Sequence, residues 1–234
     1  MKRVAVIVAS SCAAMAAGVS PAHATDECQG LMVCVPIAGP WVVVPARLTV
    51  PRRRVEFQLS CPRNYVVGGL DAELSEPAID LAFLGTLGSP VNPGISTARA
   101  VVFVATYVGA RPGRTPSFRP HIGCIPASGG GGRVLTSVDV VQPGKPAVRR
   151  AFTLRARPGA HSFVRRCGNG ERLTAASTAV GFYRDDPPGA RLARSVIVRR
   201  SVHAGAVSVS VRAGPAVGRA RAIVQLDLVC AGGE

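Results

Sequence analysis

Aromatic residues and lysine are scarce in this chain of 234 residues. Phenylalanine, tryptophan and tyrosine together make up 5% of the sequence, and only two of the 28 basic residues are lysines. Few aromatic rings leave little surface on which nucleic-acid bases could stack. The content of 26 glycines and 19 prolines argues against long helices and coiled coils. No apolar run beyond the N-terminal region is long enough to cross a bilayer, because arginines interrupt each of them.

Common catalytic motifs are also missing. The chain contains no Gly-x-Ser-x-Gly elbow, no His-Glu-x-x-His and no Cys-x-x-Cys, so serine-hydrolase, zinc-protease and thioredoxin-like chemistry have no recognisable starting point. Three histidines follow the N-terminal region, namely His121, His161 and His203, and none recurs at an equivalent place. The sequence therefore predicts no catalytic residue, metal site or cofactor, and it favours a protein that is not an enzyme.

The acidic residues leave one enzymatic alternative open. Two carboxyl groups about 5 to 10 Å apart can hydrolyse a glycosidic bond. The carboxylates that could form such a pair are Asp71, Glu73, Glu76, Asp80, Asp185 and Asp186. Asp71 and Glu73 would share one face of a strand, which is also how an ordinary solvated face looks. A secreted hydrolase acting on glycans is thus the alternative function, and a purely structural envelope component is the third.

The N-terminus has the pattern of a secretory signal. Lys2 and Arg3 precede an uncharged stretch over residues 4–18, and Ala22-His23-Ala24 supplies small residues at the positions that a signal peptidase requires. We predict a signal peptide over residues 1–24 and a mature protein that begins at Thr25, without a transmembrane segment. The expected location is extracellular or at the cell wall.

Cysteine spacing indicates an internal repeat. Six cysteines remain after residue 24, and an even number in an exported chain implies disulfides, although six cysteines allow 15 connectivities. Cys61 and Cys124 lie 63 positions apart, and so do Cys167 and Cys230. A shift of 106 residues superposes these cysteines and also places Phe57 on Phe163. The repeat favours the pairs Cys28 with Cys34, Cys61 with Cys124, and Cys167 with Cys230.

Alternating apolar and polar residues predict antiparallel strands in both copies. Val207, Val209 and Val211 alternate with Ser208, Ser210 and Arg212, and Val224, Leu226, Leu228 and Cys230 alternate with Gln225, Asp227 and Val229. This period of two is typical of strands with one face in the core and one in water. We expect an all-β protein of two tandem antiparallel β-sandwich or partly open barrel domains. The expected parts are an N-terminal segment over 25–39, a first repeat over 40–126, a glycine-rich linker with a possible strand over 127–145, and a second repeat over 146–234.

Positive charge is concentrated in the second copy. Residues 25–140 carry ten arginines against eight acids, whereas residues 141–234 carry fifteen arginines and Lys145 against five acids. The candidate polyanion-binding residues form three adjacent pairs, which are Arg149, Arg150, Arg165, Arg166, Arg199 and Arg200. Neighbours on a strand point to opposite faces, so each pair can place only one guanidinium on a given surface. A basic face would suit an anionic or glycan polymer of the envelope, whereas specific nucleic-acid reading is not expected. Codon bias in a GC-rich genome would also produce many arginines.

A short N-terminal stretch resembles a group of exported proteins. Asp26-Glu27-Cys28 with Cys34, then Gly39-Pro40-Trp41, and finally Cys61-Pro62 before Val67-Gly68-Gly69 are similar to uncharacterised exported proteins of high-GC Gram-positive bacteria. The resemblance covers about the first fifty residues after the signal. It implies export and no particular activity, and it carries over no catalytic residue.

Overall fold

A computed structural model describes residues 25–46, 52–84, 99–127 and 147–232. The predicted signal peptide and almost all of the predicted linker, with its possible strand, lie outside these ranges. Within them the chain is all-β, with 61% strand and 6% helix. The expected fold class is therefore confirmed at the level of an all-β protein with curled antiparallel sheets.

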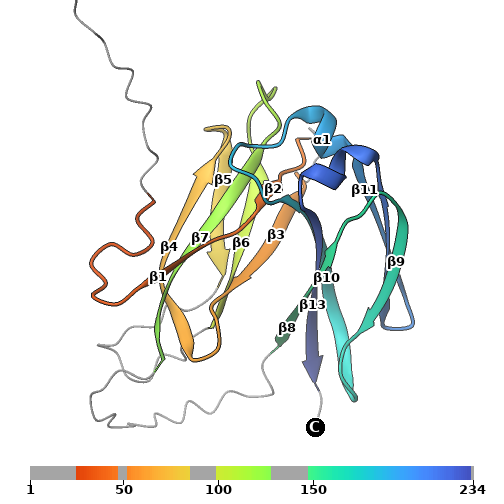
Figure 1. Cartoon of the computed structure of the whole chain (residues 1–234). Helices are drawn as coiled ribbons and strands as arrows, with labels where there is room; N and C mark the ends of the chain where they lie inside the picture. Colours follow the sequence, from red (N-terminus) through yellow and green to blue (C-terminus); the bar gives the residue numbers. More distant parts are fainter. Residues whose placement is uncertain (1–24, 47–51, 85–98, 128–146, 233–234) are drawn as a thin grey trace, which may run out of the picture.

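Two groups of strands follow one another along the chain (Figure 1). The first unit comprises β1 (Val35–Ala38), β2 (Trp41–Val43), β3 (Arg54–Ser60), β4 (Tyr65–Leu74), β5 (Ile79–Leu84), β6 (Ala100–Tyr107) and β7 (Ser117–Pro126). The second unit comprises β8 (Val148–Arg155), β9 (Gly159–Arg166), β10 (Glu171–Phe182), β11 (Val196–His203), β12 (Ala206–Ala213) and β13 (Ala222–Gly232). Two short helices, α1 (Ala190–Arg194) and η1 (Pro215–Arg219), flank β11 and β12.

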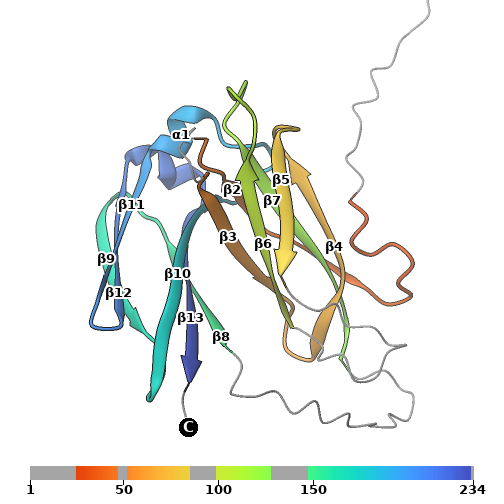
Figure 2. The ribbon, with the colours of Figure 1, turned by 180° about the vertical axis from the view of Figure 1, so that it is seen from behind.

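One large sheet runs through both units. Its strand order is β1-β7-β2-β10-β13-β8, with β4 on the other edge of β7, and all of its pairs are antiparallel. The sheet β3-β6-β5 belongs to the first unit and the sheet β11-β12-β9 to the second (Figures 1 and 2). Strand β2 pairs with β7 through Val42 and Val43 and with β10 through Trp41 and Val42. The two units are therefore joined by main-chain hydrogen bonds.

Strand pairing has the same register in both units. Phe57 pairs with Phe103 between β3 and β6, and the positions 106 residues later, Phe163 and Val209, pair between β9 and β12. The β4–β7 ladder has an irregularity between Val67 and Gly69, and the β10–β13 ladder has one between Leu173 and Ala175, again 106 residues later. The units differ in the connection that follows β10, which is longer and contains α1.

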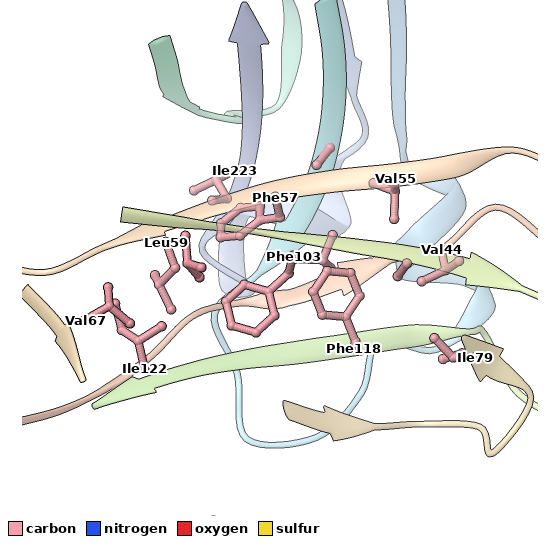
Figure 3. Close-up of a cluster of buried hydrophobic side chains, with 14 of the residues drawn as sticks. Val44, Val55, Phe57, Leu59, Val67, Ile79, Phe103, Phe118, Ile122 and Ile223 are labelled. Atoms are coloured by element: carbon pink, nitrogen blue, oxygen red, sulfur yellow. The ribbon is translucent and has the colours of Figure 1, made fainter. Parts of the chain in front are cut away.

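Each unit has its own apolar core, made by the inward residues of its strands. Phe57, Phe103 and Phe118 lie at the centre of the first core (Figure 3). In the second core, β12 contributes Val207, Val209 and Val211, while Ser208, Ser210 and Arg212 face away. The alternation predicted for β12 is confirmed. Full burial of one such aliphatic or aromatic side chain stabilises a fold by about 1.5 to 3 kcal/mol.

Strand β13 departs from the expected pattern, because both of its faces are buried. Leu226 and Leu228 face the second core, whereas Gln225 and Asp227 on the opposite face are also buried. The side chain of Gln225 exchanges two hydrogen bonds with the backbone of Gln58 in β3, accepting from its N–H at 2.6 Å and donating to its carbonyl at 2.9 Å. The prediction of a solvated face was wrong here, because β3 of the first unit covers that face.

Three disulfides link the cysteines that the repeat favours. Cys61 with Cys124 and Cys167 with Cys230 each connect the end of a strand in a small sheet to a strand of the large sheet, with Cα atoms 5.7 Å apart. Cys28 with Cys34 closes a small N-terminal loop. Gly69 and Gly123 lie under this loop, where an added Cβ would come within about 2 Å of the Glu27 carbonyl. Both positions therefore require glycine for the loop to pack.

Candidate functional site

The outward face of the sheet β11-β12-β9 is lined by arginine and serine. We call it the serine–arginine face and define it by the side chains that point away from the second core, which are Ala160, Ser162, Val164, Arg166, Ile197, Arg199, Ser201, His203, Ser208, Ser210 and Arg212. Strand pairing arranges them in rows: Arg199, Ser210 and Ser162 form one row across the three strands. The next row contains Arg212 between Ile197 and Ala160.

A shallow depression of about 360 Å³ lies where these two rows meet. Its lining includes Arg199 and Arg212 with the hydroxyl-bearing Ser162 and Ser210. Guanidinium groups recognise phosphate, sulfate and carboxylate oxygens with several donors at once, and serine hydroxyls add further donors. The depression is thus suited to an anionic group rather than to a cation or an apolar ligand.

Carboxylates are missing from all three strands of this sheet. Strands β9, β11 and β12 contain five arginines and two histidines but neither aspartate nor glutamate. The wider segment 187–226 has seven arginines and no acid. Because opposite charges would partly cancel the potential of the arginines, their absence from these strands leaves the sheet strongly positive.

Two of the six predicted polyanion-binding arginines, Arg166 and Arg199, lie on the serine–arginine face. Their neighbours Arg165 and Arg200 point to the other side of the same sheet, as the alternation along a strand requires. The guanidinium of Arg165 lies 5.1 Å from the centre of the Phe152 ring and 5.6 Å from that of Phe163. This stacking places Arg165 at the margin of the second core.

The remaining predicted pair, Arg149 and Arg150 on β8, is engaged with carboxylates. Arg150 makes a two-pronged ion pair with Glu171, whose carboxylate also accepts a hydrogen bond from the Gly168 N–H. The hydrogen bond from the Arg150 guanidinium is the main cause that lowers the pKa of the Glu171 carboxyl below its ordinary value, and the bond from the Gly168 N–H acts in the same direction. Arg149 points the other way, into the interface between the units. Neither side chain is part of the serine–arginine face.

Arg212 is not among the residues predicted from the sequence, because it has no adjacent arginine. The signal was nevertheless present in the alternation of Val207, Val209 and Val211 with Ser208, Ser210 and Arg212. Once the valines are assigned to the core, Arg212 must face outward with the serines.

A buried ionic cluster fastens the two units together. Nη1 of Arg149 donates to Glu56 Oε2 at 2.8 Å and to Asp227 Oδ2 at 2.5 Å, and Arg54 lies 3.1 Å from Glu56 Oε1. Glu56 comes from β3 of the first unit, whereas Arg149 and Asp227 come from the second. Burial opposes the charge on Arg149, but its bonds to both carboxylates outweigh this and raise its pKa. One arginine thus bridges two carboxylates across the interface.

We expect this cluster to make stability depend on pH. Burial raises the pKa of Asp227 above its ordinary value of 3.8, with Arg149 opposing the shift. Between pH 3.8 and the raised pKa, the folded protein therefore binds more protons than the unfolded chain. The contribution of Asp227 to the free energy of unfolding is thus greatest below this pH window and falls as pH rises through it. Urea denaturation from pH 3 to 7 should show this slope, and Asp227→Asn should remove it. A slope of opposite sign that depends on Asp227 would contradict the assignment.

Three of the six acidic residues of the hydrolase alternative, Asp71, Glu73 and Glu76, are held in local contacts. Glu73 is bound by His121 Nε2 at 2.8 Å and lies 3.5 Å from Arg119. Asp71 accepts hydrogen bonds from the backbone of Asp26 and Ala72, and Glu76 accepts one from the backbone N–H of Arg114. His121 is buried, with Glu27 of the N-terminal loop 3.7 Å from its other ring nitrogen. The contacts of Asp71, Glu27 and Glu73 attach the loop to the first unit. The other three candidates, Asp80, Asp185 and Asp186, are exposed.

Among the described residues, one group has the geometry of potential metal ligands, consisting of Cys167, Glu171 and Cys230. Its two sulfurs form a disulfide, which removes the thiolates that a metal would need.

In the part of the chain that the structure covers, no helix has the length and apolar character needed to span a membrane. Comparison with protein-family models, curated proteins and solved structures gave no match.

Proposed function

We propose that this protein binds anionic polymers outside the cell through its serine–arginine face. The observation that carries the proposal is a three-stranded sheet whose exposed face combines three arginines with four serines while its strands contain no carboxylate. Rows of side chains on a sheet are repeated at intervals of about 5 Å across the strands and about 7 Å along them. Such spacing suits a polymer with regularly spaced anionic groups.

An exported, non-catalytic role is part of the same proposal. It is supported by the signal-like residues 1–24 and by three disulfides, which persist in oxidising compartments. The polymer would then be an anionic glycan or a related component of the envelope or its surroundings.

We also propose that the two units arose by internal duplication. Support comes from the equal cysteine separations, the common register of β3–β6 and β9–β12, and ladder irregularities at positions 106 residues apart. In a duplicated chain, the first copy kept acids in balance with arginines while the second became basic.

Binding to heparin at several salt concentrations tests the proposed function. In the full mature chain, Arg166→Gln, Arg199→Gln and Arg212→Gln together should weaken binding and flatten its salt dependence. On duplex DNA each lost phosphate contact lowers the slope of log affinity against log salt by about 0.9, so three contacts account for roughly 40-fold of the fall between 50 and 200 mM. The slope should change less on a less densely charged polymer.

The matched control removes the same number of positive charges, three, from another part of the surface. Arg191, Arg194 and Arg219 are exposed on or beside the short helices, and their replacement by glutamine should leave heparin binding nearly unchanged. Equal weakening by the two triple variants would show that only net charge matters. That result would reject the serine–arginine face and favour codon bias as the origin of the arginines.

A further inference from the structure

A second cavity, of about 560 Å³, lies between the two units and is separate from the serine–arginine face. One wall comes from Arg53, Arg54 and Glu56 of the first unit, and the other from β10 and β11 of the second. Strand β11 divides the two sites: Arg199 lines the depression on its outer side, and Arg200 lines this cavity on its inner side. We call the cavity the inter-unit groove.

The groove carries an excess of positive charge. Arg53, Arg54 and Arg200 line it together with one carboxylate, that of Glu56. Both oxygens of Glu56 are already bound, one by Arg54 and the other by Arg149. Arg200 donates to the Ala176 carbonyl and has further N–H donors to offer. Among the lining residues the one carboxylate is thus already paired, and an anionic group in the groove would meet guanidinium donors.

The groove also contains a hydroxyl without a partner. Ser177 lines the groove, and its Oγ is buried and makes no hydrogen bond in the described structure. Its cross-strand neighbour Asp227 likewise has a buried oxygen, Oδ1, without a partner. Buried polar atoms in folded proteins are nearly always satisfied. The Ser177 hydroxyl has almost no accessible surface in its present rotamer, so rotation about its Cα–Cβ bond has to bring it into the groove before it can meet a ligand.

Small side chains complete the lining. Ala175, Ala176 and Val198 present apolar surface, and no aromatic residue is among the lining residues. The volume lies within the usual range for pockets that bind small organic molecules and greatly exceeds what a single ion requires. A nucleobase would find no ring on which to stack. The ligand class that fits is one with hydroxyl groups, some apolar surface and an anionic group.

We infer that the inter-unit groove binds an acidic saccharide unit. Its anionic group would lie between Arg53 and Arg200, and one of its hydroxyls would bond to Ser177 Oγ once that side chain has rotated into the groove. The site goes beyond the proposed function, because it requires none of the side chains of the serine–arginine face. The groove is formed by residues of both units. A ligand can therefore bind only while the two units are packed against each other, and its binding stabilises their interface.

Glucuronic acid, glucose and sodium sulfate are suitable probes for the full mature protein. Glucuronic acid should raise the thermal unfolding midpoint in a concentration-dependent manner at constant ionic strength, and calorimetric titration should detect binding. Arg53→Gln with Arg200→Gln should weaken this binding more than tenfold. Arg199→Gln, on the opposite side of β11, should leave it unchanged while reducing heparin binding, so failure of either proposal can be recognised separately.

Ser177→Ala gives the sharpest test, since a binding role and a structural role predict different results. Removing a buried hydroxyl that has no partner should leave the free protein as stable or make it more stable. Loss of one hydrogen bond to the ligand should weaken glucuronic acid binding about tenfold. Lower stability with unchanged binding would overturn the proposal. Equal affinity for glucose, or sulfate binding as tight as that of glucuronic acid, would also overturn it.

Discussion

Replacing Cys167 and Cys230 together by alanine should lower the free energy of unfolding by up to about 4 kcal/mol. The bridge closes a loop of 63 residues in sequence separation, and the chain-entropy model assigns a stabilisation of this size to such a loop. It also ties β13, which is buried on both faces, to the small sheet that carries the serine–arginine face. Urea denaturation of the variant and the parent chain measures the loss.

The other two bridges provide matched controls. Cys61 and Cys124 have the same separation of 63, so their replacement should cost a similar amount, whereas loss of the Cys28–Cys34 bridge, with a separation of 6, should cost about 2 kcal/mol. Because the two long loops are equal, a difference between them measures the packing lost in each unit. A smaller loss from either long bridge than from the short one would contradict the chain-entropy account.

Arg149→Met should destabilise the protein by about 3 kcal/mol. The substitution keeps much of the side-chain volume but leaves the buried carboxylates of Glu56 and Asp227 without the guanidinium that bridges them. Removing one partner of a buried ion pair typically costs about 3 to 5 kcal/mol, and the partial exposure of Arg149 favours the lower end. Chemical denaturation at neutral pH is the measurement.

Arg150 is the matched control, since it is the next residue on the same strand. Its ion pair with Glu171 is on the solvent side, so Arg150→Met should change stability little. Adding Glu56→Gln and Asp227→Asn to Arg149→Met should recover most of the loss, because the uncompensated charges are then gone. If the Arg149 and Arg150 variants were equally stable, the interface cluster would have no special role.

Local patterns were sufficient to predict much of this fold. The alternation of β12 identifies its buried valines and its outward Ser208, Ser210 and Arg212, because successive side chains on a strand must point to opposite faces. The equal separations of the long cysteine pairs pointed to the bridges in the structure. The same geometry separates Arg199 from Arg200, which the structure places on the two sides of β11.

Other features depend on contacts between residues far apart in the chain. Gln225 and Asp227 look like members of a solvated face, but β3, more than 160 residues earlier, covers them. The sequence also does not show that Arg149 binds a buried carboxylate whereas Arg166 lies on an exposed face. Nothing in the neighbouring residues distinguishes these two environments.

The sequence by itself thus determined the strand-rich composition, the sides of β12 and β13 that face the second core, the disulfide framework and the excess of positive charge. It could do so because these properties depend on side-chain chemistry and on a period of two along the chain. Only the tertiary structure decided which outward sides remain exposed, which arginines are neutralised, and that a groove lined by Arg53 and Arg200 lies between the units. Those outcomes depend on how one sheet packs against another, and pairwise packing between distant segments leaves no local pattern in the sequence.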